Sequence, residues 1–311
     1  MSVQPQIDTA ITYIHNSPAS FRSQLLQVLM TILGKKKNIE RKLLANKLSE
    51  AAKIPQVLLS DFSVQVSELN QRKVWTLKPK EHTSEKVILY LHGGGYISNI
   101  TKYDWSLIQT LLVKTNCTII VADYPLAPRS SYQDVYCYLD LLYSNLLTET
   151  SQDNIIFMGN SAGGGIALGF AQKLRNENRP GPSQIILNSP WLDITMSNPD
   201  ILEIDKKDKL LSIKGLKMAG QAYATSLDAK DYRVSPLYGN FSDLGRISLF
   251  IGTHDLFCAD ARKLKDKLKE QNIPINYFEY PQMFHVWIAV TSLKESQHAI
   301  DQIAILIKPK N

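Results

Sequence analysis

Hydrophobic residues recur along this chain with two different periods, and the change of period divides the chain into regions. Up to about residue 55 the apolar positions recur at helical spacing, as in Ile7, Ile11 and Ile14, and the run from Leu25 to Ile32 continues the pattern. Over residues 61–78 apolar and polar residues alternate on either side of a polar break, which predicts a β-hairpin. We therefore expect a wholly helical first segment followed by a hairpin.

Strand-like and helix-like stretches alternate from residue 86 to the end of the chain. Runs rich in Val and Ile predict strands at 86–91, 118–123, 154–159, 184–189, 247–252 and 275–280. Amphipathic stretches between them predict helices at 103–115, 131–146, 162–177, 260–271 and 292–307. Such an order predicts an α/β fold with a mostly parallel sheet covered by helices on both faces.

One connection in the alternating region is too long for an ordinary crossover. Residues 198–228 are polar and helix-like, so we interpret them as part of a cap over the carboxyl edge of the sheet. The expected domain organisation has three parts. They are an N-terminal helical cap segment over residues 1–55, a core made of residues 56–195 and 236–311, and a second cap segment over residues 196–235.

Composition and charge describe an ordinary globular protein of 311 residues, with 44% hydrophobic and 21% charged residues. The net charge of +6 comes from scattered basic residues, and we interpret the one tight run, Lys35–Lys37, as a solvated turn. We expect no nucleic-acid partner and no stable membrane association, since the apolar run 25–33 is too short to span a bilayer. The first twenty residues lack the apolar core of a signal peptide, which favours a cytoplasmic protein.

Three cysteines, Cys117, Cys137 and Cys258, stand far apart in the chain. Their odd number and wide spacing argue against a disulfide framework and against a zinc site. We expect buried thiols in a reducing compartment.

A Gly-x-Ser-x-Gly sequence, Gly159 to Gly163, stands between a predicted strand and a predicted helix. By itself the pentapeptide is weak evidence, since a chain of this length contains one by chance about one time in ten, and a glycine-rich connection would look the same. A strand, a sharp turn and a helix in immediate succession are, however, what a nucleophile elbow requires. The strained serine of such a turn needs small residues two positions away on each side. Ser161 is therefore the candidate nucleophile.

Three successive glycines, Gly93 to Gly95, follow the first strand of the alternating region. Ordering three glycines costs chain entropy, so a functional reason for the run is expected. The alternative interpretation is a flexible turn without a function. A loop whose backbone N–H groups approach a ligand would supply that reason. In acyl transfer these groups, with the N–H of Ala162, would bind the oxyanion of the tetrahedral intermediate. We interpret the neighbouring His92 as structural.

A serine nucleophile needs a base and a group that orients the base, and in this topology the acid precedes the histidine. Only His254, His285 and His298 follow Ser161 in the chain. His285 is favoured because it lies beyond a short turn after strand 275–280. His254 abuts the end of the preceding strand, and His298 lies in an amphipathic helix where we expect a surface residue.

Asp255 is the favoured acid because it directly follows strand 247–252. Loops at the carboxyl ends of strands are where ligand chemistry gathers in open α/β sheets. Asp193 and Asp260 are the alternatives. The first can also be explained as bracing a loop, and the second as a helix N-cap.

Six short motifs occur in order between residues 86 and 290. They are His92-Gly93-Gly94-Gly95-Tyr96, Asp123-Tyr124-Pro125-Leu126-Ala127-Pro128, Gly159-Asn160-Ser161-Ala162-Gly163-Gly164, Ser189-Pro190-Trp191-Leu192-Asp193, Gly252-Thr253-His254-Asp255 and His285-Val286. Together they resemble the hormone-sensitive-lipase-like branch of the α/β-hydrolases, which includes many bacterial esterases. The resemblance implies an α/β-hydrolase fold with a two-part helical cap.

The resemblance also implies a site. It assigns a triad of Ser161, Asp255 and His285, with oxyanion donors from the glycine loop, Gly93, Gly94 and Gly95, and from Ala162. Within the loop, Gly94 and Gly95 are the expected donors.

Three positions depart from the pattern of this family. Asn160 stands where the family more often has Asp, and Arg129 follows Leu-Ala-Pro where Glu is usual. Met283-Phe284 precede His285 where a glycine is common. None of these departures removes a triad member.

The expected function is that of a serine carboxylesterase that hydrolyses short-chain acyl esters through an acyl-enzyme, without metal or organic cofactor. Its partner would be a small-molecule ester. An amidase or deacetylase on the same triad is an alternative, and a ligand-binding receptor is another. The plant gibberellin receptor resembles this family but has lost its catalytic histidine, so the presence of His285 argues against a receptor. A general peptidase is disfavoured because no propeller-like repeat is present, and a homodimer could form through the edge strand 275–280.

Overall fold

A computed structural model describes residues 10–45, 50–81 and 83–308 of the chain. Its strands are β1 (Thr12–Ile14), β2 (Phe62–Leu69), β3 (Arg72–Pro79), β4 (Val87–Leu91), β5 (Thr118–Ala122), β6 (Ile155–Asn160), β7 (Gln184–Asn188), β8 (Arg246–Gly252) and β9 (Ile275–Tyr280). Its helices are α1 (Phe21–Ile32), α2 (Asn38–Leu44), α3 (Gln56–Asp61), α4 (Lys102–Thr115), α5 (Tyr132–Glu149), α6 (Ala162–Asn176), α7 (Ile201–Asp205), α8 (Ile213–Ala224), α9 (Cys258–Glu270) and α10 (Lys294–Ile307).

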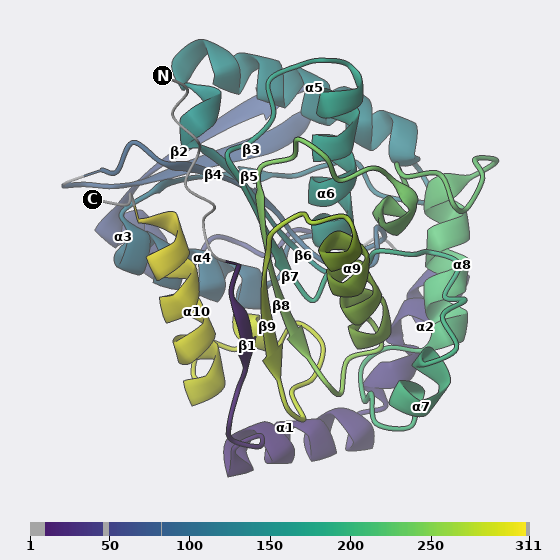
Figure 1. Ribbon diagram of the computed structural model, residues 1–311. Coiled ribbons are helices and arrows are strands. Elements are labelled where there is room, and N and C mark those ends of the chain that lie inside the picture. The colour runs from purple at the N-terminus through teal and green to yellow at the C-terminus, as the bar shows by residue number, and fades with distance from the viewer. Residues whose placement is uncertain (1–9, 46–49, 82, 309–311) are drawn as a thin grey trace.

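Within the described residues the strands form one nine-stranded sheet in the order β1-β9-β8-β7-β6-β4-β5-β3-β2 (Figure 1). The hairpin β2–β3 pairs antiparallel, and β3 joins β5 antiparallel, whereas β4 to β9 pair in parallel. The mostly parallel α/β sheet predicted from the alternating pattern is therefore confirmed. The predicted strands and helices from residue 86 onward are found with ends that shift by one or a few residues.

The hydrophobic side chains of successive strand residues enter two different cores. On β4, Leu89 packs with α5, α6 and α9, whereas Ile88 and Tyr90 pack with α4 and α10. This alternation follows from the two-residue period of a strand and explains why the parallel strands are apolar throughout. Figure 1 shows α4 and α10 on one side of the sheet and α6 and α9 on the other.

The N-terminal segment is not wholly helical, which corrects one prediction. Thr12–Ile14 form β1, which pairs in parallel with β9, and the Tyr277 N–H donates to the Ile11 carbonyl at 2.7 Å. A strand of three residues takes its conformation from its partner, so helical spacing of the neighbouring isoleucines misled the prediction. The pairing also corrects the expectation that β9 is an edge strand open to a second subunit, because β1 covers that edge.

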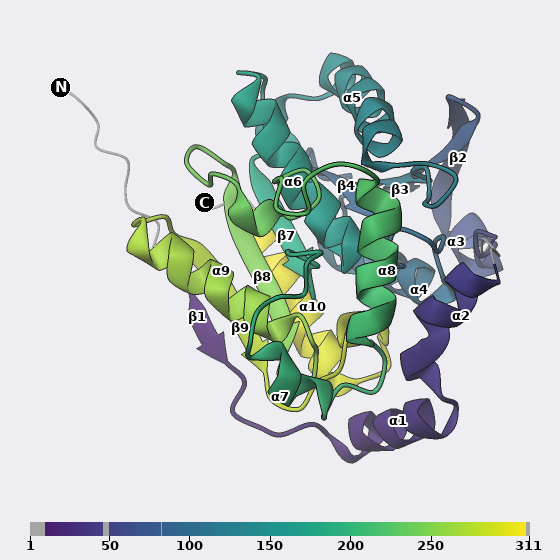
Figure 2. The same ribbon diagram turned by 90° about the vertical axis from the view of Figure 1, so that its right-hand side faces the viewer.

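Helices from two distant parts of the chain lie together beside the carboxyl ends of the parallel strands. In Figure 2, α1 and α2 lie near α7 and α8. The Ser212 hydroxyl donates to Glu40 Oε1 at 2.6 Å, which ties the start of α8 to α2. A two-part arrangement of this kind fits the expected cap, whose boundaries at residues 55, 196 and 235 remain predictions.

Two composition-based expectations can be compared with the structure. Cys117 and Cys258 are buried free thiols, but Cys137 is exposed on α5, so the expectation of buried cysteines fails at that position. Among the residues described, none of the helices combines the length and the apolar character that crossing a membrane requires.

Candidate active site

Ser161 lies at a turn between β6 and α6, with φ of 54° and ψ of −119°. The turn leaves no room for side chains at its flanking glycines. A Cβ on Gly159 would stand 2.2 Å from the Gly163 carbonyl oxygen, and one on Gly163 would stand 2.1 Å from the Leu91 carbonyl oxygen. The glycines on either side of Ser161 are therefore required by the tight packing of the turn against itself and β4, as the motif predicts.

The structure brings Ser161, His285 and Asp255 into one hydrogen-bonded chain. His285 Nδ1 lies 2.9 Å from Asp255 Oδ2, and His285 Nε2 lies 2.9 Å from Ser161 Oγ. Because a carboxylate can only accept, Nδ1–H is the donor to Asp255, and the lone pair of Nε2 then faces the serine hydroxyl. This tautomer is the one that a base acting on Ser161 needs.

Asp255 is fully buried in the loop after β8. Its Oδ1 accepts the Phe257 N–H at 3.0 Å, which leaves Oδ2 for His285. Burial and these two donors hold the carboxylate in one orientation. His285 in turn packs edge-on against the Phe257 ring, with centroids 5.1 Å apart.

The alternative acids make other contacts. Asp193 accepts the Thr195 N–H at 2.8 Å and the Tyr238 hydroxyl at 2.8 Å, so it braces its own loop. Asp260 lies inside the first turn of α9 rather than at the N-cap, which is Phe257, so the N-cap interpretation is wrong. Its Oδ1 accepts from Asn198, and burial raises its pKa to about 6.

Three other histidines considered above, His254, His298 and His92, contact groups other than Ser161 and Asp255. His254 Nδ1 lies 3.1 Å from Gln27 Oε1 on α1, and burial lowers its pKa. His298 is half-buried rather than on the surface, and its Nδ1 lies 2.9 Å from the Tyr280 hydroxyl. His92 is buried, stacks on Tyr124 and donates from Nδ1 to the Gly93 carbonyl at 2.7 Å, and burial lowers its pKa. These contacts fit the structural interpretation of His92.

The glycine loop adopts a conformation that only glycine adopts readily. Gly94 has φ of 118° and Gly95 has φ of 63°. A Cβ on Gly94 would stand 2.3 Å from the Ser98 carbonyl oxygen, whereas one on Gly93 would stand 3.3 Å from Ser161 Cβ. The loop therefore passes directly beside Ser161.

The first residue of α6 contributes a donor to the same place. Ala162 follows Ser161, and the N–H of a first helical residue has no acceptor within the helix. The aligned peptide dipoles of α6 also favour negative charge at this end. A developing oxyanion beside Ser161 would meet this field.

Tyr124 supports the glycine loop from behind. Its hydroxyl donates to the His92 carbonyl at 2.7 Å. Arg72 donates to the Asp123 carboxylate at 3.0 Å and to the Tyr124 carbonyl at 2.9 Å. The motif beginning at Asp123 thus fixes the base of the loop, while Arg129, one of the departures, is exposed to solvent.

Asn160, the second departure, belongs to a fully buried polar network. Its side-chain amide donates to the Tyr90 hydroxyl at 2.5 Å and to Asp104 Oδ1 at 3.2 Å. The side-chain oxygen Oδ1 of Asn160 accepts from the side-chain amide of Asn188 at 3.0 Å. An amide suits this position because it donates toward a carboxylate and accepts from another amide at once.

The third departure lies in the turn before His285. Met283 and Phe284 are buried, and the Met283 carbonyl accepts the His254 N–H at 3.0 Å. A Cβ on Gly252 would stand 2.2 Å from that carbonyl oxygen. The turn is thus packed against the end of β8, which positions His285 without a glycine.

Asp208 is a buried carboxylate that the sequence analysis missed. It lies between α7 and α8, and its Oδ2 accepts the N–H of Leu256, the neighbour of Asp255, at 2.8 Å. Its Oδ1 accepts the N–H groups of Leu210 and Leu211 at 2.7 and 2.9 Å. Burial, followed by the Asp255 charge, raises the pKa of Asp208 to about 6. No local motif marks this residue, because its partner stands 48 positions later.

A row of buried aromatic rings also connects α8 to the site. Tyr223 of α8 stacks on Tyr96, with centroids 3.8 Å apart, and Tyr96 stacks on Trp191 at 4.9 Å. Trp191 stacks on Phe257 at 5.6 Å, and Phe257 meets His285. The row gives the predicted motif residues Tyr96 and Trp191 a packing role.

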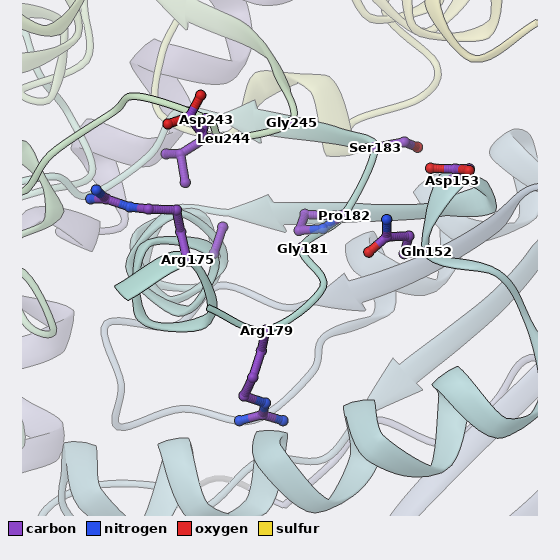
Figure 3. Close-up of a pocket in the computed structure, with 11 residues that line it drawn as sticks. Gln152, Asp153, Arg175, Arg179, Gly181, Pro182, Ser183, Asp243, Leu244 and Gly245 are labelled. Atoms are coloured by element: carbon purple, nitrogen blue, oxygen red, sulfur yellow. The ribbon is translucent and has the colours of Figure 1, made fainter. Parts of the chain in front are cut away.

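A cavity of about 300 Å³ lies at the opposite edge of the sheet, near the starts of β6, β7 and β8. Figure 3 shows Arg179 turned away from the other labelled lining residues. It pairs with Asp140 and Glu177, while Arg175 donates to the Asn240 carbonyl. The cavity is therefore separate from the Ser161 site.

Comparison with known proteins places the chain in a family. The family described as having the alpha/beta hydrolase fold matches residues 88–289. An esterase from Acinetobacter venetianus is 27% identical over 230 residues, which is 71% of this chain and 74% of the esterase. An acetyl-hydrolase from Streptomyces hygroscopicus is 26% identical over 203 residues, or 65% of this chain and 68% of that protein.

A solved structure supports the same fold. The crystal structure of an esterase/lipase from an uncultured bacterium superposes with a TM-score of 0.79 at 24% identity, covering 93% of this chain and 98% of that one. The motifs, the sheet topology and the match over residues 88–289 agree. The chain therefore belongs to the α/β-hydrolase fold family, in its hormone-sensitive-lipase-like branch.

Proposed function

We propose that the protein is a serine carboxylesterase that hydrolyses short-chain acyl esters of small molecules. The observation that carries the proposal is the chain from Ser161 through His285 to Asp255, with both hydrogen bonds at 2.9 Å. The chain stands beside a glycine loop and a helix N-terminus, as acyl transfer requires. The relatives named as an esterase and an acetyl-hydrolase support both the ester hydrolase class and a short acyl group.

In the first half of the reaction Ser161 Oγ attacks the ester carbonyl while His285 Nε2 takes its proton. The Asp255 carboxylate stabilises the imidazolium and keeps Nδ1 protonated. The tetrahedral intermediate collapses when His285 returns the proton to the departing alcohol. An acyl group then remains on Ser161.

In the second half a water molecule loses its proton to His285 and attacks the acyl-enzyme; the second intermediate then breaks its bond to Ser161 Oγ, which takes the proton back from His285, and the carboxylic acid leaves. Both tetrahedral intermediates carry a negatively charged oxygen beside Ser161. We assign its binding to the N–H groups of Ala162, Gly94 and Gly95, with Gly93 giving the substrate close access. The left-handed backbone of Gly94 and Gly95 supports this assignment.

Hydrolysis of p-nitrophenyl acetate, butyrate, octanoate and palmitate tests the proposal. We expect the highest kcat/KM on acetate or butyrate, and a loss of several orders of magnitude in Ser161→Ala. Ser197→Ala, at an exposed serine of the second cap segment, is the matched control and should retain activity. A maximum at palmitate would refute the short-chain assignment, and a fully active Ser161→Ala protein would refute the nucleophile.

The amidase alternative is separated by a matched pair of substrates. Comparable or higher kcat/KM on p-nitroacetanilide than on p-nitrophenyl acetate would replace the esterase proposal by an amidase on the same residues. The esterase proposal expects the acetate ester to be preferred by orders of magnitude.

A further inference from the structure

Helix α1 places two polar side chains, together with the partly buried Leu26 and Met30, against the protein and turns most of its apolar side chains toward solvent. Ser23 is fully buried and Gln27 is 8% exposed. Arg22, Gln24 and Thr31 are exposed, and the other exposed side chains are apolar, at 47% to 79% exposure. These apolar side chains are Phe21, Leu25, Val28, Leu29 and Ile32, followed by Leu33 just after the helix. This is the reverse of the usual arrangement, in which the apolar stripe of a surface helix faces the core.

Specific hydrogen bonds fix this reversed orientation. Glu295 of α10 accepts from the Ser20 N–H at 2.5 Å and from the Ser23 hydroxyl at 3.2 Å. The side-chain amide of Gln27 donates to the backbone carbonyl of Gln282 at 3.0 Å. The side-chain oxygen Oε1 of Gln27 lies 3.1 Å from His254 Nδ1. A helix held by buried polar contacts along its inner face cannot roll over without breaking all of them. The exposed apolar face is therefore a built feature of the surface.

Positive charge is concentrated in the same segment. Residues 10–45 contain six basic side chains and one acidic side chain, a net charge of +5 in a chain of net charge +6. Arg22, Lys35 and Lys37 are exposed beside the apolar face, whereas Lys36 pairs with Asp205 at 2.9 Å. The lysine run, a single 3₁₀ turn over Lys35–Lys37, thus adjoins the exposed apolar side chains of α1.

We propose that α1 and the lysine turn after it, which we call the docking face (residues 21–37), bind reversibly to a lipid surface that carries negative charge. An apolar helical face with flanking lysines and arginines is the composition of helices that lie in a membrane interface. Both views show α1 lying across the base of the molecule (Figures 1 and 2). The docking face can therefore meet a flat surface along its length.

The charge distribution distinguishes a lipid surface from a second copy of the chain. Two copies packed through this face would bring together two segments that each carry four basic and no acidic residues. Anionic headgroups would instead neutralise them, while the acyl boundary receives the apolar side chains. A docked protein would lie on the surface, since none of its described helices is able to span a membrane.

The contacts of α1 place this surface near the site. His254 and Gln282 adjoin the loops that carry Asp255 and His285, and both bond to Gln27. Docking would bring these loops close to esters dissolved in the lipid. This consequence rests on the proposed function, whereas binding of the docking face to lipid does not.

Vesicle flotation of the full chain tests the proposal without turnover. We expect binding to vesicles of phosphatidylglycerol and phosphatidylcholine, and much weaker binding to phosphatidylcholine alone. Leu25→Ser with Ile32→Ser should weaken binding about tenfold or more, because both side chains would lose their burial in the acyl boundary. Lys35→Glu with Lys37→Glu should weaken binding to the anionic vesicles by about 25-fold or more, because each lysine lost costs about fivefold. Binding to phosphatidylcholine alone should not change.

A matched control uses exposed apolar residues on other helices. Val113→Ser on α4 with Ile305→Ser on α10, 65% and 61% exposed, should leave binding unchanged. Equal thermal unfolding midpoints show that each variant is folded. Failure of the wild-type protein to float with anionic vesicles would overturn the proposal. It would also be overturned if light scattering showed a dimer that Leu25→Ser with Ile32→Ser makes monomeric.

Discussion

Replacing Asn160 by aspartate, the residue that the family pattern more often has there, should destabilise this protein at neutral pH. The amide nitrogen of Asn160 lies 3.2 Å from Asp104 Oδ1 inside a fully buried network. In Asn160→Asp a carboxylate oxygen would take its place, and Asp104 would face a second negative charge. Asparagine therefore suits position 160 because the buried network already contains the carboxylate of Asp104.

The size of the effect can be bounded in two ways. Two unit charges 3.2 Å apart repel by about 5 kcal/mol at an effective dielectric constant of 20. The introduced carboxyl can instead stay protonated and donate to Asp104 as the amide does, which at pH 7 costs about 4 kcal/mol for a group with an ordinary pKa of 3.9. Protonation is the cheaper route, so about 4 kcal/mol is the expected loss at pH 7. At pH 5 the same reasoning gives about 1.5 kcal/mol.

Urea unfolding of the wild type and Asn160→Asp at pH 5 and pH 7 measures this difference. The introduced carboxyl would have a raised pKa in the folded protein, so its destabilisation must grow as pH rises above about 4. Asn160→Ala, which leaves Asp104 without this donor but adds no charge, should show a loss that is nearly independent of pH. A loss in Asn160→Asp that is the same at both pH values, or smaller at pH 7, would refute the reasoning.

Three further predictions concern single residues. In Asp255→Asn the imidazole loses its orienting carboxylate, and we expect kcat on p-nitrophenyl butyrate to fall by about four orders of magnitude with KM little changed; retention of more than a tenth of kcat would contradict this. In Gly94→Ala the added Cβ would meet the Ser98 carbonyl oxygen at 2.3 Å, so the loop must move and kcat should fall about a hundredfold or more; an unchanged kcat would exclude the loop from catalysis. Asp208→Asn removes a buried carboxyl whose pKa is raised to about 6. Because that pKa lies above its unfolded value, the wild type loses stability as pH rises from about 4 to 6. Urea unfolding should therefore show the variant gaining up to roughly 3 kcal/mol relative to the wild type between pH 4 and pH 7. A stability difference that stays constant with pH would contradict a raised pKa for Asp208.

The parts of the fold that could be predicted are those whose signal is local and repeated. Parallel strands buried on both faces show as apolar runs, and the helices between them show helical spacing, so β4 to β9 were found. Strand β1 could not be found, because three residues carry no period and their partner Tyr277 lies 265 positions from Thr12. Helix α1 was predicted as part of a helical segment, but its orientation depends on Glu295 and Gln282, which no local pattern reveals.

The candidate site divides in the same way. Ser161, Asp255 and His285 stand at strand ends within short motifs, and the structure brings these three side chains together. Asp208 lies in a segment without a motif, and its importance arises from a contact to the backbone beside Asp255. Asp260 was misread because an acidic residue near a helix start resembles a cap, although here the helix begins two residues earlier.

Covalent labelling by a fluorophosphonate, mapped by peptide mass spectrometry, tests the central claim most directly. The account predicts one label for each chain on the peptide that contains Ser161, no label in Ser161→Ala, and labelling slowed by orders of magnitude in His285→Ala. Ser197→Ala should label at the wild-type rate. Labelling at another residue, or ester hydrolysis by a wild-type protein that resists the reagent, would contradict the claim that His285 activates Ser161.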